Sequence, residues 1–193
     1  MSKNANHPRS LSSDPDPAAE GPKGITPRSG QTLCGDLDMR IDRNGVWYYH
    51  GSPIGRKELV RLFSSVLRRD DAGDYWLITP AEIGRIEVED APFMAVELIT
   101  TDDGADRVIT FRTNVDTFVS ADGDHPIRVD IDPDTGEPSP YVVMDGRLEA
   151  RLTRSVYYDL IELGTEEKID AERSFGVWSG GAFFTLGNLE TAP

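Results

Sequence analysis

The sequence contains one cysteine, three histidines and no long hydrophobic run. Because Cys34 has no partner, an internal disulfide is excluded, and so is a zinc site built from cysteines. A membrane-spanning helix needs about 20 predominantly apolar residues, and no segment comes near that length. Polar Ser, Asp and Pro residues stand where a signal peptide has its apolar centre. We therefore expect a cytoplasmic protein without a membrane span.

Basic side chains are also scarce, with 20 Lys and Arg against 34 Asp and Glu, a formal net charge of -14. A nucleic-acid-binding surface needs a basic face to displace counterions, so we exclude nucleic acid as a partner. The glycine-rich loops that cradle phosphates in nucleotide-binding proteins are absent as well. We expect no cofactor.

Residues 1–32 are rich in Pro, Gly and Ser and have only Met1, Leu11 and Ile25 as larger apolar side chains. Such a segment cannot bury enough surface to offset the entropy of ordering it. We predict a disordered tail over residues 1–32 and expect its removal to leave the stability unchanged. The rest divides into an N-terminal α+β half-domain (33–80) and a C-terminal β-rich half-domain with one helix (81–193).

Hairpins dominate the pattern after the tail. Arg43-Asn44-Gly45 separates two short strand-like runs, and an Asn-Gly pair favours a hairpin because both residues tolerate positive φ. Apolar residues at helical spacing predict helices over residues 58–69 and 152–163. Two further hairpins are predicted, joining residues 93–100 to 108–112 and 175–178 to 182–186.

Residues 39–63 and 129–160 follow the same order of strand, glycine turn, strand and helix. This order predicts a duplication. Two units that are each too small for a good core would bury their apolar faces against each other. A cleft between the two half-domains is then the expected ligand site.

Several motifs together resemble the bacterial domain-of-unknown-function family 1285 (DUF1285). They are Gly45–Ile54, Glu58–Arg69, Tyr75–Glu82, Val88–Phe93, Phe111–Asn114, Pro140-Tyr141 and Gly176–Phe184. The resemblance covers about residues 37–186. It implies an α+β fold of two similar half-domains, the C-terminal one similar to a pleckstrin-homology-type barrel, with a ligand site between them. It also implies a role in signal transduction or regulation, and it indicates no reaction.

The candidate binding residues gather around the X-Pro segments at Pro80 and Pro92, which favour extended backbone. The predicted hairpin through Asp103-Gly104 places a strand with an arginine and an amide beside them, and these groups could orient a small polar ligand against an apolar wall. The alternative is that Pro92 and Phe93 belong to the core and that Arg112 neutralises Asp90. The predicted site comprises Glu82, Asp90, Pro92, Phe93, Arg112 and Asn114, with Trp47 and His50 as further candidates.

Catalytic and metal-binding signatures are weak. Gly51-Ser52-Pro53-Ile54-Gly55 has its serine in the second position, whereas a nucleophile elbow needs it in the third. The acidic run from Asp130 to Glu137 lacks the glycine and the final glutamate of a calcium loop, and Asp122-Gly-Asp124-His125 is typical of a turn. We predict no catalytic and no metal-binding residue.

One basic concentration stands out in the acidic sequence, on the polar side of the first predicted helix. We interpret it as a solvated face paired with nearby carboxylates, the alternative being a site for an anionic ligand or partner. Its members are Arg56, Lys57, Arg61, Arg68 and Arg69.

The sequence thus favours a non-enzymatic module that binds an unknown small ligand or a protein between its half-domains. The alternative is a hydrolase assisted by Glu82 and Asp90, with or without a divalent ion.

Overall fold

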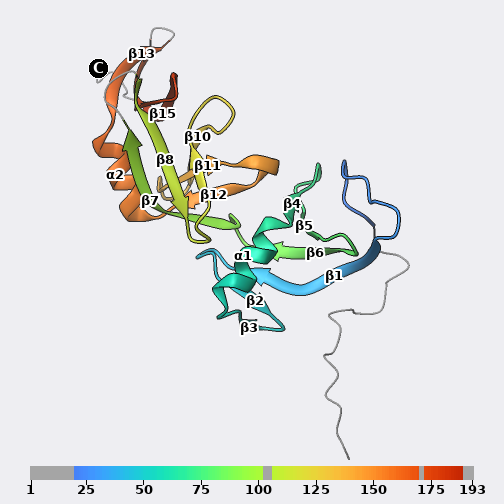
Figure 1. The fold of residues 1–193 in the computed structure, drawn as a ribbon. Helices are drawn as coiled ribbons and strands as arrows, with labels where there is room; N and C mark the ends of the chain where they lie inside the picture. The colour runs from blue at the N-terminus through green and yellow to red at the C-terminus, as the bar shows by residue number, and fades with distance from the viewer. Residues whose placement is uncertain (1–19, 102–105, 170–171, 189–193) are drawn as a thin grey trace, which may run out of the picture.

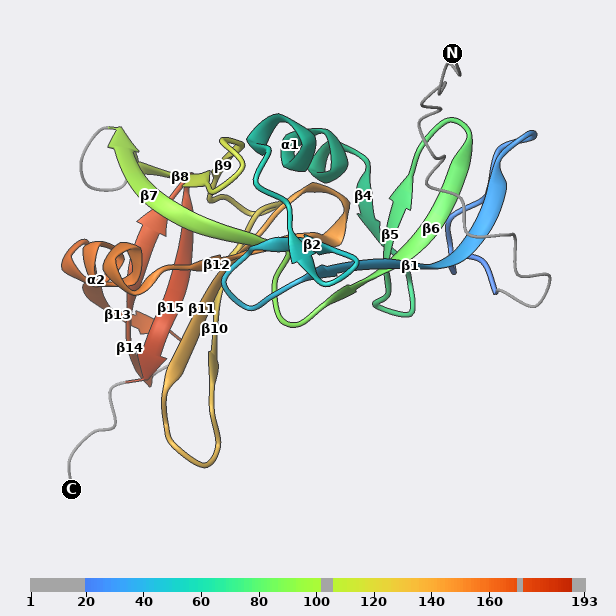
Figure 2. The same cartoon turned by 90° about the horizontal axis from the view of Figure 1, so that it is seen from below.

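The computed structural model describes residues 20–101, 106–169 and 172–188, which form two lobes lying side by side (Figures 1 and 2). The first lobe contains residues 20–88 and the second residues 93–188. Strands dominate, so the fold is α+β with a strong β bias. Within the described residues, no helix has the length and apolarity needed to cross a membrane.

The first lobe is built on a six-stranded sheet in the order β3-β2-β1-β6-β5-β4. The central strands β1 and β6 are parallel, and the other neighbours are antiparallel. The predicted Asn44-Gly45 hairpin is confirmed, with Ile41 opposite Trp47. Its elements are β1 (Thr32–Ile41), β2 (Trp47–Tyr49), β3 (Ser52–Pro53), α1 (Lys57–Ser65), β4 (Leu67–Arg69), β5 (Tyr75–Ile78) and β6 (Glu82–Val88).

The second lobe contains another six-stranded sheet, in the order β9-β8-β7-β12-β11-β10, again with a parallel central pair, β7 and β12. Pairing of β7 with β8 confirms the second predicted hairpin. The elements are β7 (Phe93–Thr101), β8 (Val108–Thr113), β9 (Phe118–Ser120), β10 (Ile127–Ile131), β11 (Pro138–Val143), the short 3-10 helix η2 (Asp145–Arg147) and β12 (Glu149–Leu152).

Helix α2 (Arg154–Glu162) follows β12 and leads into a small sheet of β13 (Thr165–Ile169), β14 (Glu172–Ser179) and β15 (Ala182–Asn188). The antiparallel pairing of β14 and β15 confirms the third predicted hairpin. Buried Ser179 ties this sheet to the larger one, because its Oγ accepts from Ile109 N–H (2.8 Å) and donates to the Ala121 carbonyl (2.6 Å).

The two six-stranded sheets have the same strand arrangement, but the segments that correspond between them are not the predicted ones. In each, the first and last strands lie parallel at the centre, so β1 corresponds by position to β7. The predicted superposition of residues 39–63 on 129–160 would instead match β1, a central strand, with β10, an edge strand. The helices differ too, since α1 follows the third strand of its sheet and α2 follows the sixth.

The predicted helix ends and the lobe boundary also need correction. Helix α1 stops at Ser65, and Leu67, although it keeps the helical spacing, lies in β4 opposite Leu77. Leu152 likewise belongs to β12 rather than α2. Strand β6 pairs with β1, so the change of sheet falls between Val88 and Phe93 rather than after residue 80. This pairing joins residues far apart in the sequence, and no local pattern reports it.

The predicted tail is ordered in its described part, residues 20–32. The Lys23 N–H donates to Asp70 Oδ2 (2.9 Å), the Asp71 N–H donates to the Lys23 carbonyl (3.0 Å), and the Gln31 amide donates to the Thr79 carbonyl. Pro22 is buried. Hydrogen bonds from both backbone and side-chain groups therefore order a segment whose composition offers little apolar surface. Residues 1–19 lie outside the described residues.

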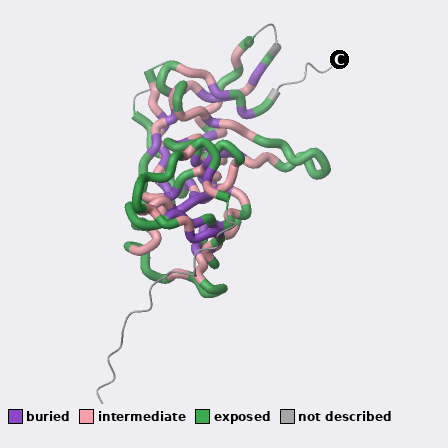
Figure 3. The backbone as a smooth tube through the Cα atoms, turned by 90° about the vertical axis from the view of Figure 1, so that its right-hand side faces the viewer, coloured by how far each residue is buried: buried purple, intermediate pink, exposed green. Residues whose placement is uncertain are grey.

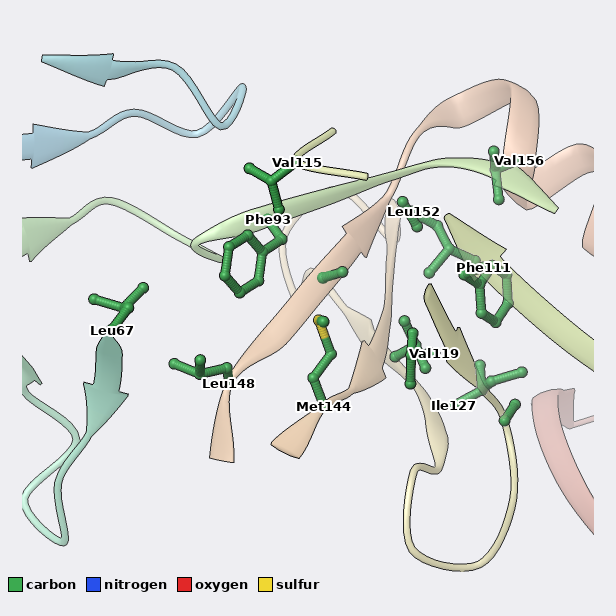
Figure 4. Packing of buried hydrophobic residues seen from close by; sticks show 14 of the residues in the cluster. Leu67, Phe93, Phe111, Val115, Val119, Ile127, Met144, Leu148, Leu152 and Val156 are labelled. Carbon is green, nitrogen blue, oxygen red and sulfur yellow. The ribbon is translucent and has the colours of Figure 1, made fainter. Parts of the chain in front are cut away.

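One hydrophobic cluster contains residues of both lobes, and Figure 3 shows buried segments in each of them. Leu67 of the first lobe faces Phe93 and Leu148 of the second across the junction, and Met144 and Val119 continue the core beyond them (Figure 4). Because each lobe contributes side chains to this cluster, the junction between the lobes is part of the core. This arrangement positions the site described next.

Candidate functional site

A cavity of about 720 Å³ opens between the two lobes. Its first wall comes from α1 and the start of β4, with Arg61, Ser64 and Arg68. The opposite wall comes from the β8–β9 turn and η2 of the second lobe. Helix α1 lies next to β9 in Figure 2, and side chains from both line the cavity. The expected cleft between the halves is therefore present.

The floor of the cleft is apolar. It is formed by Phe93 at the start of β7, by Val115 and Val119 around the β8–β9 turn, and by Met144 and Leu148, which flank η2 (Figure 4). All five side chains are buried to more than nine-tenths. A ligand reaching the floor would meet hydrocarbon rather than polar groups.

Cationic groups stand at the rim of the cleft. Arg61 forms an ion pair with Asp116 across the two walls, and Asp116 also accepts from Arg112 (2.8 Å). Arg68 donates to the carbonyls of Ser65 (3.1 Å) and Leu67 (2.6 Å). Within the described residues no carboxylate lies within ion-pairing distance of Arg68. Arg68 is therefore the rim arginine whose charge is available to a ligand.

His125 is the third basic side chain of the rim. Its ring lies between two carboxylates, with Nδ1 3.1 Å from Asp122 and Nε2 3.3 Å from Asp145. Partial burial lowers the pKa of His125, but the hydrogen bonds and charges of Asp145 and Asp122 outweigh it and raise the pKa above its ordinary value. The same Asp122 accepts the N–H groups of Asp124 and His125, as expected for a turn.

The predicted carboxylate pair is not assembled. Glu82 begins β6, whereas Asp90 follows its end. A strand rises about 3.3 Å per residue, so the seven residues of β6 alone separate the two positions by roughly 20 Å. Glu82 lines a different cavity, of about 70 Å³, together with Cys34. Burial and the charge of Glu82 raise the pKa of the Cys34 thiol.

Asp90 holds a structural position. It accepts a hydrogen bond from the Tyr141 hydroxyl (2.8 Å) and pairs with Arg151 (2.8 Å). Burial, followed by the hydrogen bond to Asp90, raises the pKa of Tyr141 to about 12. The interpretation that Arg112 neutralises Asp90 is therefore wrong, because Arg112 pairs with Glu97 (2.5 Å) and Asp116 instead.

Asn114 joins the two lobes. Its Nδ2 donates to the Gly45 carbonyl (3.1 Å) in the β1–β2 turn, and its Oδ1 accepts from the Met94 N–H (3.1 Å) at the start of β7. With both side-chain groups engaged in this way, Asn114 fixes the junction beside the cleft.

The remaining predicted residues contribute packing more than ligand contacts. Trp47 is buried and stacks on Phe63 (6.2 Å between ring centroids), and its Nε1 has no hydrogen-bond partner among the described residues. His50 is exposed and lies 2.6 Å from Asp38. Pro92 and Phe93 are buried, as the alternative interpretation holds. Of the eight predicted site residues, Phe93 alone lines the cleft.

Comparisons with known proteins match almost the whole described chain. Residues 30–91 match the N-terminal domain of unknown function of DUF1285, and residues 92–186 match the C-terminal domain of the DUF1285 protein of unknown function. A crystal structure of a DUF1285 family protein from Silicibacter pomeroyi DSS-3 shares 42% sequence identity with a TM-score of 0.76, covering 88% of this chain and 92% of that one. The chain belongs to the DUF1285 family.

A second DUF1285 family structure, from Shewanella baltica OS155, shares 27% identity with a TM-score of 0.53, over 65% of this chain and 91% of that one. No protein in the curated set matches. The boundary between the two matched DUF1285 domains, at residues 91 and 92, coincides with the change of sheet between Val88 and Phe93.

Sequence reasoning missed Arg61, Arg68 and His125 as the polar rim of this DUF1285 cleft. The sequence does show both groups, because Arg61 and Arg68 belong to the basic helix face and His125 to the Asp122–His125 turn. What was missing is the strand order, which places the β9–β10 loop and η2 opposite α1. No cluster of three or more metal-ligating side chains occurs within residues 20–101, 106–169 and 172–188.

Proposed function

We propose that the protein is a binding module whose cleft between the lobes takes a small organic anion with an apolar part. The single observation that carries this proposal is the cavity of about 720 Å³ with an apolar floor and a cationic rim, in a chain whose formal net charge is -14. Apolar pockets with a few convergent polar groups are the usual form of small-ligand sites.

The rim favours an anion over a cation. Arg61, Arg68 and His125 face the cavity against Asp116 and Asp145. Asp116 is already engaged by two arginines, and the Asp145 side chain is fully exposed at the edge. The Arg68 guanidinium has donors left for a carboxylate or phosphate, which it can bind in a bidentate geometry.

The hydrolase alternative has no comparable support, because it needs Glu82 and Asp90 at one centre and the strand β6 separates them. A regulatory or signalling role, a cytoplasmic location and a pleckstrin-homology-type barrel in the second lobe stay predictions from the sequence and the family resemblance. A binding module without its own reaction is compatible with all three.

The proposal can be tested by isothermal titration calorimetry with octanoate as the probe. Octanol and octylamine carry the same chain without the negative charge and serve as ligand controls. We expect octanoate to bind at one site and Arg68→Gln to weaken its binding about tenfold, the usual effect of losing one charged hydrogen bond.

Lys57→Gln is the matched protein control, because Lys57 begins α1, is exposed and does not line the cleft. Its octanoate affinity should equal that of the unmodified chain. Equal binding of octanol and octanoate, or equal effects of the two substitutions, would contradict the proposal.

A further inference from the structure

A second cavity, of about 330 Å³, lies on the other side of the β7 start and gathers three arginines. Successive side chains of a strand point to opposite faces. At the start of β7, Phe93 lines the cleft described above and Met94 lines this second cavity. The two cavities are therefore separate, and a ligand in one does not touch the polar groups of the other.

The three arginines come from three structural elements, and Arg43 is distant in the sequence from the other two. Arg43 belongs to the β1–β2 turn, Arg151 to β12, and Arg154 begins α2. Glu137 is the carboxylate among the lining residues. The lining therefore has three guanidinium groups against one carboxylate, while outside the lining Asp90 pairs with Arg151 and Glu89 lies 4.0 Å from Arg43.

These arginines keep hydrogen-bond donors available. Arg154 donates its Nε to the Tyr158 hydroxyl (2.9 Å), and no carboxylate of the described residues lies within ion-pairing distance of it. The Arg43 side chain is 73% exposed and approaches Glu89 only at 4.0 Å. Arg151 is held in place by Asp90 (2.8 Å) and Ser139 (3.3 Å). Each guanidinium has five N–H donors, so these contacts leave several for a ligand.

Tyrosine rings and apolar side chains complete the cavity. Tyr157 and Tyr158 project from the first turns of α2, and Met94, Pro140 and Leu152 line the cavity with them. The half-exposed ring of Tyr158 offers a flat face for an aromatic or sugar ring. The cavity volume suits a small molecule rather than a folded partner.

We infer that this second cavity binds a small organic phosphate, with the phosphate held by Arg43, Arg151 and Arg154. A phosphate monoester carries a charge of about -1.5 to -2 at pH 7 and three terminal oxygens. This charge and shape match three guanidinium groups that line one cavity better than a single carboxylate does, and a dianion also outweighs the repulsion of Glu137.

Calorimetric titration with phenyl phosphate at low ionic strength tests the inference, with benzoate as the carboxylate control. We expect phenyl phosphate to bind this cavity more tightly than benzoate, and any weaker binding of either anion in the cleft to be lost in Arg68→Gln. Arg154→Gln should weaken its binding about tenfold or more, and Glu137→Gln should strengthen it. Arg43→Gln provides a second loss-of-charge variant if Arg154→Gln does not fold.

Two control variants separate this site from the cleft and from general charge attraction. Arg68→Gln removes the rim arginine of the cleft that has no carboxylate partner among the described residues, and Arg173→Gln removes an exposed arginine that pairs with Glu166 on the small sheet. Both should leave the phenyl phosphate affinity unchanged. The inference is overturned by the absence of saturable binding at millimolar phenyl phosphate, by equally tight benzoate binding, or by an equal loss in either control.

Discussion

Asp70 is a buried carboxylate that four N–H groups satisfy without a cation. Its side chain accepts from the backbone of Lys23, Ala72 and Asp74 (2.9 Å each) and from the Trp76 indole (3.0 Å). Burial by itself raises the pKa of Asp70, but the hydrogen bonds outweigh it and lower the pKa below its ordinary value. A single side chain thus organises the β4–β5 turn and anchors the N-terminal segment.

The lowered pKa gives Asp70 a defined pH signature. A group whose pKa falls on folding stabilises the folded state above its unfolded-state pKa, and this contribution is lost as the pH falls through the folded-state pKa. We expect Asp70→Asn to cost about 3 kcal/mol at pH 7, because an NH2 group replaces one of the two accepting oxygens and leaves two buried N–H donors without an acceptor. The difference should shrink below about pH 4. Urea unfolding across pH measures it.

Asp159→Asn is the control for this prediction. Asp159 is an exposed carboxylate on α2 that makes no hydrogen bond or ion pair with another described residue, so its replacement should change the stability by less than about 0.5 kcal/mol at every pH. A difference between Asp70→Asn and the unmodified chain that stays constant from pH 7 to pH 3 would argue against the assigned hydrogen bonding.

The N-terminal segment shows that composition alone does not predict whether a segment is ordered. Residues 20–31 look like a disordered tail, yet Lys23 and Gln31 bond to the first lobe and Pro22 is buried. We expect removal of residues 1–30 to lower the melting temperature by about 5 °C or more, since a loss of 1 kcal/mol shifts it by about 2–4 °C in a protein of this size. Differential scanning calorimetry gives the shift.

Removal of residues 1–19 is the matching control, because it keeps buried Pro22 and the Lys23 hydrogen bonds, which the longer deletion removes. The longer deletion should therefore be the less stable of the two. Equal melting temperatures for both deletions would show that the contacts of residues 20–30 contribute nothing to stability.

Elements with local signals could be predicted from the sequence, and those that depend on distant partners could not. Turn residues between strand-like runs predict the Asn44-Gly45 hairpin and the hairpin of β14 and β15. Leu67 has the spacing of a helix but lies in β4, because pairing with Leu77 buries it. A buried position takes an apolar residue whether it lies in a strand or in a helix, so the apolar pattern alone does not distinguish the two at this position.

The shared plan of the two six-stranded sheets belongs to the whole molecule. The parallel pairs β1–β6 and β7–β12 each join the two ends of a long chain segment. Local sequence patterns do not predict such pairs. For the same reason the cleft could be expected between two halves, but its rim could not be assigned. Arg68 and His125 line the same cleft only because η2 and the β9–β10 loop lie opposite α1.

The lobes share one core and should unfold together. Gly45 at their junction has φ +73°, and a Cβ on it would lie 2.7 Å from Asn114 Nδ2 and 2.9 Å from Met94 Cγ. Gly51 has nearly the same φ, +72°, and a Cβ on it would have no neighbouring atom within 4 Å. Both alanine substitutions therefore introduce the same backbone strain, about 1–2 kcal/mol, and differ only at the junction.

We expect Gly45→Ala to be about 1–3 kcal/mol less stable than Gly51→Ala, because it crowds the junction and displaces the Asn114 hydrogen bonds. Calorimetry should show one transition for the unmodified chain, with equal van't Hoff and calorimetric enthalpies. Equal stabilities of the two variants would mean that the Gly45 contact does not hold the lobes together. Two separate transitions in the unmodified chain would show that the continuous core does not couple them.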